Sequence, residues 1–342
     1  MLYLTTRSKQ NTYTAARALT EDRGPDGGFY VPLQLPRLDD SEIKSLGANS
    51  FSQNVAEVIN LFFGTRLDSW AIEFAIGRYP VKLVSITGRE MVVETWHNPM
   101  WKFERLARGI EKAIHHSDKV CPVLPDWVMT ASRIAVLFGI FGELMREGVE
   151  MPIDVAVPNG DFSAPMAVWY AREMGLPIST ILCCCNDNNG TWRLLHKGEI
   201  RTDAASVATA TPLCDHAAPR GLERLIFASL GTGAAIAFAE SCDAGATYYV
   251  ETEQQLMLRK GMYVSVTGFR RLESAVCNLC QNHRYLPDPY TALCFGGISD
   301  YRSVTGAGGK ILILSEESPG YSLEFLAKCL GLSPWELKNR LK

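Results

Sequence analysis

The sequence lacks the features that mark nucleic-acid-binding and membrane-spanning proteins. It has 34 lysines and arginines against 37 aspartates and glutamates, a formal net charge of −3, so no basic field would attract a nucleic-acid backbone. No apolar run approaches the roughly 18 residues that cross a bilayer, and the run from Ile134 to Gly142 is too short. The N-terminus has no long apolar segment of a secretory signal. These absences predict a soluble, cytoplasmic protein without nucleic-acid or membrane partners.

The ten cysteines form neither a disulfide framework nor a zinc pattern. Three of them stand together at 183–185 in an apolar run, and successive strand residues alternate between faces, so they cannot converge on one metal ion. Cys277, Cys280 and His283 have a zinc-like spacing, but no second Cys/His pair stands at finger or ribbon spacing. The segment 271–283 also has helical character. We expect reduced thiols and no metal site.

The periodicity of the apolar residues predicts an α/β protein. Hydrophobic residues make up 47% of the 342 residues, enough to bury one large core or two joined cores. Strands and helices alternate from residue 153 onward, as in a parallel sheet. Helices are predicted over 11–19, 39–46, 51–63, 67–77, 101–114, 131–146, 164–174, 322–329 and 334–342, and strands over 3–8, 81–86, 91–95, 153–157, 178–185 and 310–315.

One loop has the form of an anion-binding site. It lies between the predicted strand 153–157 and the predicted helix 164–174. A strand, a glycine-containing loop and a helix N-terminus together present free backbone N–H groups and the positive end of the helix dipole. The loop residues are Asn159, Gly160, Asp161, Phe162 and Ser163.

Several motifs resemble a known enzyme family. The segments 3–8 (Tyr-Leu-Thr-Thr-Arg-Ser) and 26–32 (Asp-Gly-Gly-Phe-Tyr-Val-Pro) are similar to two motifs of threonine synthases, in the same order and at a similar spacing. The segments 221–227 and 285–293 resemble later motifs, and 94–107 resembles the stretch that carries the family's pyridoxal phosphate (PLP) lysine. The resemblance implies the α/β fold of type II PLP enzymes, a parallel-rich sheet with helices on both faces.

The position of the family's lysine is altered in this chain. The family reads His-Gly-Pro-Thr-Leu-Ala-Phe-Lys-Asp, and a gap-free alignment on His97 and Pro99 places Glu104 at the lysine. A carboxylate cannot form the Schiff base that holds PLP. A two-residue deletion after Pro99 would bring Lys102 to that position instead, whereas the gap-free register keeps Phe103 on the family's phenylalanine.

A large part of the family's small subdomain is absent. Only 25 residues separate Glu104 from Thr130, and the family's PLP-clasping Ser-Gly-Asp-Thr-Gly loop occurs nowhere in the sequence. We therefore expect a threonine synthase-like N-terminal region over residues 1–90. A PLP-enzyme-like α/β domain would follow over 91–342, with the small subdomain largely deleted after about residue 115.

The anion-type loop also departs from the family. It resembles the loop Val-Pro-Thr-Gly-Asn-Phe-Gly-Asp, which in threonine synthases holds the PLP phosphate. Asp161 replaces the family's asparagine and brings negative charge, while Ser163 replaces a glycine and adds a side chain. The loop is thus a candidate cofactor-binding site or a structural turn.

The resemblance leaves three functions open. The leading interpretation is a degenerate threonine synthase homologue, a pseudoenzyme that uses no cofactor and binds or regulates a partner. The second is an active PLP-dependent lyase of amino-acid biosynthesis, using Lys102 on O-phosphohomoserine or a related amino acid. The third is a small-anion binder or a non-PLP enzyme that reuses the cleft through Glu104, His97 and Arg105.

The candidate catalytic residues are therefore Lys102, Glu104 and His97, although the favoured interpretation of His97 is a packed turn histidine. The ligand would be a small anion or an amino acid. Loss of a subdomain would expose apolar surface, which predicts a homodimer or a protein partner that covers that face.

Overall fold

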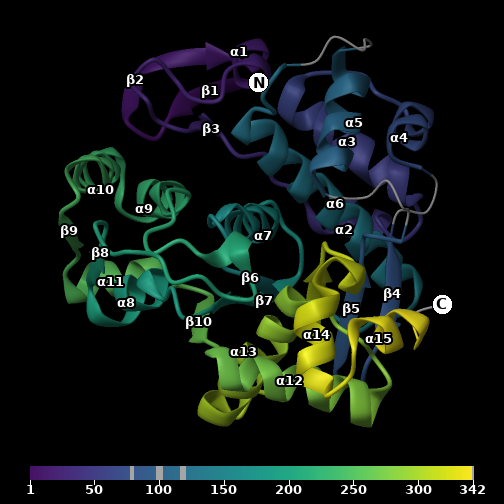
Figure 1. Cartoon of the computed structure of the whole chain (residues 1–342). Helices are drawn as coiled ribbons and strands as arrows, with labels where there is room; N and C mark the ends of the chain where they lie inside the picture. The colour runs from purple at the N-terminus through teal and green to yellow at the C-terminus, as the bar shows by residue number, and fades with distance from the viewer. Residues whose placement is uncertain (78–80, 98–102, 116–120, 341–342) are drawn as a thin grey trace.

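A computed structural model describes residues 1–77, 81–97, 103–115 and 121–340, and its centre is a six-stranded sheet (Figure 1). All neighbouring strands are parallel except β4, which pairs antiparallel with β5 as a hairpin. The prediction of a largely parallel α/β sheet is confirmed. In spatial order the strands are β10 (Met262–Val266), β7 (Ile178–Cys185), β6 (Ile153–Pro158), β11 (Ile311–Ser315), β5 (Glu90–Glu94) and β4 (Lys82–Ser85).

Helices cover both faces of this sheet. Val155 and Val157 of β6 pack into a cluster with helices α3 (Phe51–Phe63), α6 (Asp126–Arg146) and α7 (Ser163–Glu173). Ala156 packs into the opposite cluster, with α12 (Phe269–His283), α13 (Pro289–Thr305) and α14 (Leu323–Leu330). Both faces are apolar because a parallel sheet is buried on each side.

The cysteine triplet follows the same alternation. Cys183 and Cys185 belong to the first cluster and Cys184 to the second, and all three are fully buried. Cys277 and His283 lie in α12, as predicted, and the Cys277 thiol donates to the Cys329 carbonyl at 3.1 Å.

The N-terminal region contains a correction to the predicted helix over 11–19. Residues Ser8–Thr14 form strand β2, and helix α1 begins only at Ala15 and ends at Thr20. Strand β2 pairs antiparallel with β1 (Leu2–Thr5), which also pairs with β3 (Tyr30–Pro32). Burial of the Tyr13 ring against Tyr30, at 5.5 Å between centroids, outweighs the local helical pattern.

Helix α6 anchors the N-terminal region to the core. The Trp127 indole donates to the Tyr3 hydroxyl at 3.0 Å, and this hydroxyl donates to the Phe62 carbonyl at 2.6 Å. By length and composition α6 is the one helix among the described residues that could span a membrane, yet 78% of its apolar window is buried inside the fold. That burial is typical of a core helix.

One further helix precedes α6 along the chain. Helix α5 (Phe103–His115) is followed closely by α6, with only residues 116–125 between them. The other elements are α2 (Asp40–Ser45), α4 (Ser69–Ile76), α8 (Gly190–Lys197), β8 (Glu199–Arg201), α9 (Leu222–Leu230), α10 (Thr232–Ala244), β9 (Thr247–Tyr249), α11 (Thr252–Leu258) and α15 (Pro334–Arg340). Gly231 lies between the two consecutive helices α9 and α10.

The contact between α3 and α6 depends on a glycine. A Cβ atom at Gly142 would lie 2.2 Å from the Asn54 amide nitrogen and 2.7 Å from the Leu46 carbonyl oxygen. We expect Gly142→Ala to lower the free energy of unfolding by about 1–3 kcal/mol through overpacking, measured by urea denaturation. Gly233→Ala in α10 is the control, because no atom lies within 4 Å of its added Cβ, and it should be neutral or slightly stabilising. Equal effects of the two changes would contradict the close helix contact.

Candidate functional site

The carboxyl ends of the parallel strands meet at one edge of the sheet and bring polar residues together there. Glu94 ends β5, Ser315 ends β11, Asn159 follows β6 and Asn186 follows β7. All four are buried. This edge is where ligands bind in open α/β sheets, so it is the first place to look for a site.

The loop after β6 forms hydrogen bonds within itself. One carboxylate oxygen of Asp161 accepts from the Ser163 backbone N–H at 2.9 Å and from its hydroxyl at 2.6 Å. Phe162 has a φ of 75° and is fully buried, which turns the chain into α7. The Asp161 carboxylate therefore caps the N-terminus of α7, the place where a bound anion would otherwise be favoured.

Arg133 of α6 is the cation of this cluster. Its guanidinium donates to the Ser163 hydroxyl at 2.9 Å and to both carboxylate oxygens of Glu316 at 3.3 and 3.1 Å. Desolvation raises the pKa of Asp161, but the charge of Arg133 and the hydrogen bonds from Ser163 outweigh it and hold this pKa below its usual value. Asp161 is thus ionised at neutral pH, and its exposure to solvent also favours the charged form.

The space beside this cluster is small. The cavity lined by Thr95, Arg133, Ala164, Leu314 and Glu316, among others, has a volume of about 20 Å³. Small-molecule pockets measure roughly 300–1,000 Å³. A phosphate at α7 would also meet the charge of Asp161, so these residues do not fit the phosphate group of PLP.

A second polar cluster lies at the end of β5. The Glu94 side chain is 4% exposed and forms a close contact with His97, while its other oxygen accepts from the Tyr285 hydroxyl at 2.9 Å. Lys82 of β4 approaches to 3.8 Å, and the Trp96 ring stacks on His97 at 4.3 Å between centroids. Glu94 is a buried charge that these partners compensate.

This cluster continues into the neighbouring strand. Trp96 donates through its indole nitrogen to the Ser315 hydroxyl at 3.2 Å, and Ser315 donates to Asp288 at 2.8 Å. Asp288 also accepts from the first backbone amides of α13, at Tyr290 and Thr291. Burial raises the pKa of Asp288, while these hydrogen bonds oppose the increase.

Two of the three predicted catalytic residues, His97 and Glu104, lie among the described residues. His97 is 37% exposed at its side chain and pairs with Glu94 rather than with Glu104. Glu104 and Arg105 are exposed in the first turn of α5, so the idea of a buried base at Glu104 gains no support. Lys102 lies outside the described residues, and its catalytic role stays a prediction.

Sequence reasoning missed Arg133, Glu316 and Tyr285. Arg133 lies in the segment that matched a family helix, but nothing local marks its guanidinium as the partner of a loop 30 residues away. A buried charge at a strand end, such as Glu94, was the one signal that could have been noticed, because a carboxylate after a continuous apolar strand needs a cation nearby.

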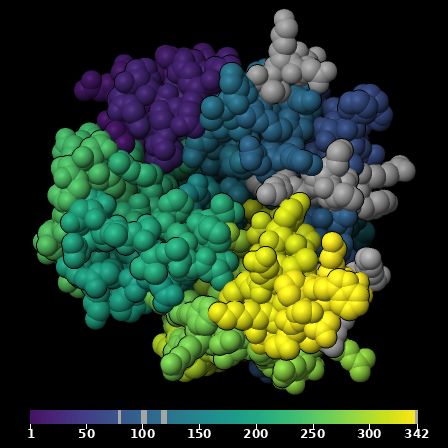
Figure 2. All heavy atoms as spheres, viewed as in Figure 1, coloured from purple at the N-terminus to yellow at the C-terminus, as the bar shows by residue number. Residues whose placement is uncertain are grey.

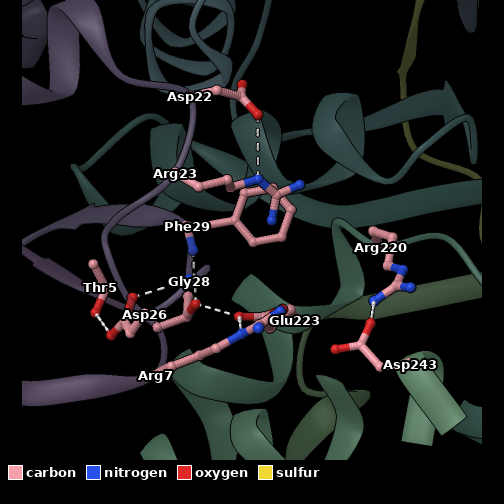
Figure 3. Close-up of polar contacts among 11 residues, drawn as sticks. Thr5, Arg7, Asp22, Arg23, Asp26, Gly28, Phe29, Arg220, Glu223 and Asp243 are labelled. Carbon is pink, nitrogen blue, oxygen red and sulfur yellow. Dashed lines mark hydrogen bonds and ion pairs between the residues drawn. The ribbon is translucent and has the colours of Figure 1, made fainter. Parts of the chain in front are cut away.

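The N-terminal motifs form a separate clamp on α9 (Figure 3). Arg7 donates to both carboxylate oxygens of Glu223, at 3.1 and 2.9 Å, and the Thr6 hydroxyl also contacts this carboxylate. In Figure 2 the purple N-terminal residues lie against the green segment that contains α9. Segment 3–8 thus holds α9 through side-chain hydrogen bonds and an ion pair.

The clamp extends to the anion-type loop and the core. The buried Arg224 side chain, 1% exposed, contacts Asp126. Its guanidinium lies 4.3 Å from the centroid of the Phe29 ring, and the guanidinium of Arg23 lies 3.3 Å from the same centroid. Gly221 donates its backbone N–H to the Asp161 carbonyl at 3.1 Å. The N-terminal region therefore helps to position the loop after β6.

Comparisons with known proteins agree with this architecture. Residues 2–78 match the family model described as threonine synthase N terminus. Threonine synthase-like 2 of Mus musculus is 29% identical over 116 residues, which cover 31% of this chain and 24% of that protein. Threonine synthase of Eremothecium gossypii is 34% identical over 102 residues, covering 30% and 20% of the two chains. The matched part thus spans about a quarter or less of these relatives' length.

The structural likeness extends much further than the sequence likeness. The PLP-bound threonine synthase from Brucella melitensis superposes with a TM-score of 0.83 at 16% identity, covering 96% of this chain and 91% of that one. The fold is therefore that of a type II PLP enzyme. Residues 2–78 match the threonine synthase N terminus, and the relatives are threonine synthases and threonine synthase-like proteins, which confirms the resemblance stated above.

The clamp predicts a large difference between two ion pairs. We expect Glu223→Ala to lower the free energy of unfolding by about 3 kcal/mol, because Glu223 is 1% exposed at its side chain and its loss leaves Arg7 without its partner. Arg220→Ala breaks the exposed pair with Asp243 and should cost at most about 1 kcal/mol. Chemical denaturation of both variants measures this, and equal losses would contradict a buried clamp.

Proposed function

We propose that this protein is a threonine synthase-like protein that does not carry out PLP Schiff-base chemistry and acts by binding or regulating a partner. The observation that carries the proposal is the carboxylate of Asp161 at the N-terminus of α7. In the family's loop this place belongs to a phosphate, and here a side chain of the protein satisfies the same backbone donor.

Charge and volume support the same conclusion. A bound phosphate would have to displace or neutralise Asp161, and Arg133, the nearest cation, already pairs with Glu316 at 3.1 Å. Like charges a few ångströms apart cost on the order of 1–4 kcal/mol in a partly solvated site. The adjoining cavity of about 20 Å³ leaves no room for an aromatic ring.

Titration with PLP tests the proposal directly. We expect wild-type protein to show no visible absorption band that borohydride reduction fixes to the chain, because Glu104 cannot replace a lysine. The same titration on Lys102→Ala is the control. A band in the wild type that disappears in Lys102→Ala would overturn the proposal and support the active lyase.

The role of Asp161 can be measured apart from catalysis. Asp161→Asn removes the negative charge from the loop, so inorganic phosphate should bind about tenfold more tightly than to the wild type, by calorimetry. Asp187→Asn, at an exposed aspartate after β7, is the matched control and should change nothing. An unchanged phosphate affinity in Asp161→Asn would show that Asp161 does not exclude anions.

We further propose that a second copy of the chain covers the side of the molecule near α4. Trp70 and Phe74 stack there at 5.5 Å between ring centroids, with exposed fractions of 69% and 82%. Helix α4 packs against α5, the helix that precedes residues 116–125, where the sequence predicts that the small subdomain is largely deleted. Exposed aromatic pairs of this size are typical of interaction surfaces.

Light scattering should detect a dimer of the wild-type protein. The double variant with Trp70→Ala and Phe74→Ala should be a monomer, because burial of these two rings would stabilise the dimer. Trp335→Ala, at an equally exposed tryptophan of α15, should leave the dimer intact. A monodisperse wild-type monomer would contradict self-association and direct attention to another protein partner.

We also propose a cytoplasmic location. All ten cysteines lie among the described residues and none forms a disulfide. Unpaired thiols in this number suit a reducing compartment.

A further inference from the structure

A wide cavity that borders the described residues lies away from the carboxyl ends of the parallel strands. It has a volume of about 790 Å³ and opens between helices α12 and α13. Glu90, the first residue of β5, lines it, whereas the clusters described above surround Glu94 and the carboxyl ends of the neighbouring strands. Glu90 and Glu94 are four residues apart along the extended strand β5, which is about 13 Å. The α12–α13 cleft is therefore a distinct site.

Polar side chains line this cleft at helical spacing. Arg271, Ser274 and Asn278 come from one face of α12, and Ser299 and Asp300 from α13. These five residues are exposed or half-buried. Their side chains supply hydroxyl, amide, guanidinium and carboxylate groups, which are the groups that orient a polar ligand.

The charges that line the cleft balance. Arg302 pairs with the buried Glu90, and Arg271 pairs with Asp300 at 3.4 Å. Two cations thus face two anions, and a ligand with a net negative or positive charge would meet repulsion from one member of each pair. A ligand that carries both charges matches the lining best.

The pair of Arg271 and Asp300 is the part that a ligand can open. Arg271 is 62% exposed and holds Asp300 through one contact at the long end of hydrogen-bond distance. The other oxygen of Asp300 accepts from the Tyr263 hydroxyl at 2.9 Å, which fixes the carboxylate in place. Arg302 also donates to the Gly309 carbonyl at 3.3 Å, so it is held more firmly than Arg271.

We propose that the α12–α13 cleft binds a small zwitterion of the free amino acid class, with its carboxylate on Arg271 and its ammonium group on Asp300. The planar guanidinium can bind a carboxylate through two parallel hydrogen bonds. The hydroxyl and amide groups of Ser274, Asn278 and Ser299 then face the ligand's side chain. This site does not depend on the fate of PLP chemistry at the opposite edge.

Calorimetry on the full chain tests the proposal, with each of the twenty standard amino acids as the probe. We expect saturable binding of at least one of them, and at least about tenfold weaker binding to Arg271→Ala, whose charge is removed. Arg270→Ala is the matched control, because Arg270 is the neighbouring exposed arginine of α12 and does not line the cleft. No binding of any amino acid, or equal binding to wild type and Arg271→Ala, would overturn the proposal.

The ligand's two charges are tested separately. Asp300→Asn keeps an acceptor for Tyr263 but removes the negative charge. It should lower the affinity for the same amino acid about tenfold. The melting temperature of the free protein should stay nearly unchanged. The N-acetyl derivative, which lacks the ammonium group, should fail to bind the wild type. If the N-acetyl derivative binds the wild type as tightly as the amino acid does, the site binds simple carboxylates and the zwitterion proposal is refuted. Undiminished binding of the amino acid to Asp300→Asn would refute it in the same way.

Discussion

The carboxyl edge of the sheet depends on the compensation of charge around Arg133. This one guanidinium joins α6, the start of α7 and the residue after β11, through Ser163 and Glu316. Taking a cation out of water is costly unless each of its donors has a partner, so the loop, the helix and the strand end must adopt positions that supply those partners. The small volume of the adjoining cavity follows from this arrangement, since Arg133, Ser163 and Glu316 hold one another.

The N-terminal region takes part in the same arrangement from a distance. Glu223 at the start of α9 receives Arg7 and Thr6, and Gly221, two residues earlier, donates its backbone N–H to Asp161. A Cβ atom at Gly221 would lie 2.3 Å from that carbonyl oxygen, so only glycine permits the approach. The N-terminal motif that resembles threonine synthases thus acts through packing: it positions α9, and α9 positions the loop after β6.

The two ends of the sheet have different physical character. At the carboxyl edge, buried carboxylates such as Glu94 and Asp288 are satisfied by close neighbours and leave little space. Between α12 and α13, small polar side chains leave a wide opening in which the paired charges stay in contact with water. A fold that carries its ligand site at the strand ends in one protein can therefore present an accessible cleft elsewhere in another.

The sequence by itself determined most of the helices and strands and the resemblance to threonine synthases. A largely continuous apolar run predicted β7 at its observed bounds, and helical spacing predicted α3 from Phe51 to Phe63, because both signals arise from burial of a chain segment in the core. The motifs at 3–8 and 26–32 predicted the threonine synthase N-terminal region for the same local reason. Only the tertiary structure decided that residues 11–14 join a strand, that His97 pairs with Glu94, and that Arg133 reaches Ser163. Each of these contacts joins groups whose pairing depends on distances in space, and no local pattern of residues records which buried charge will meet which partner.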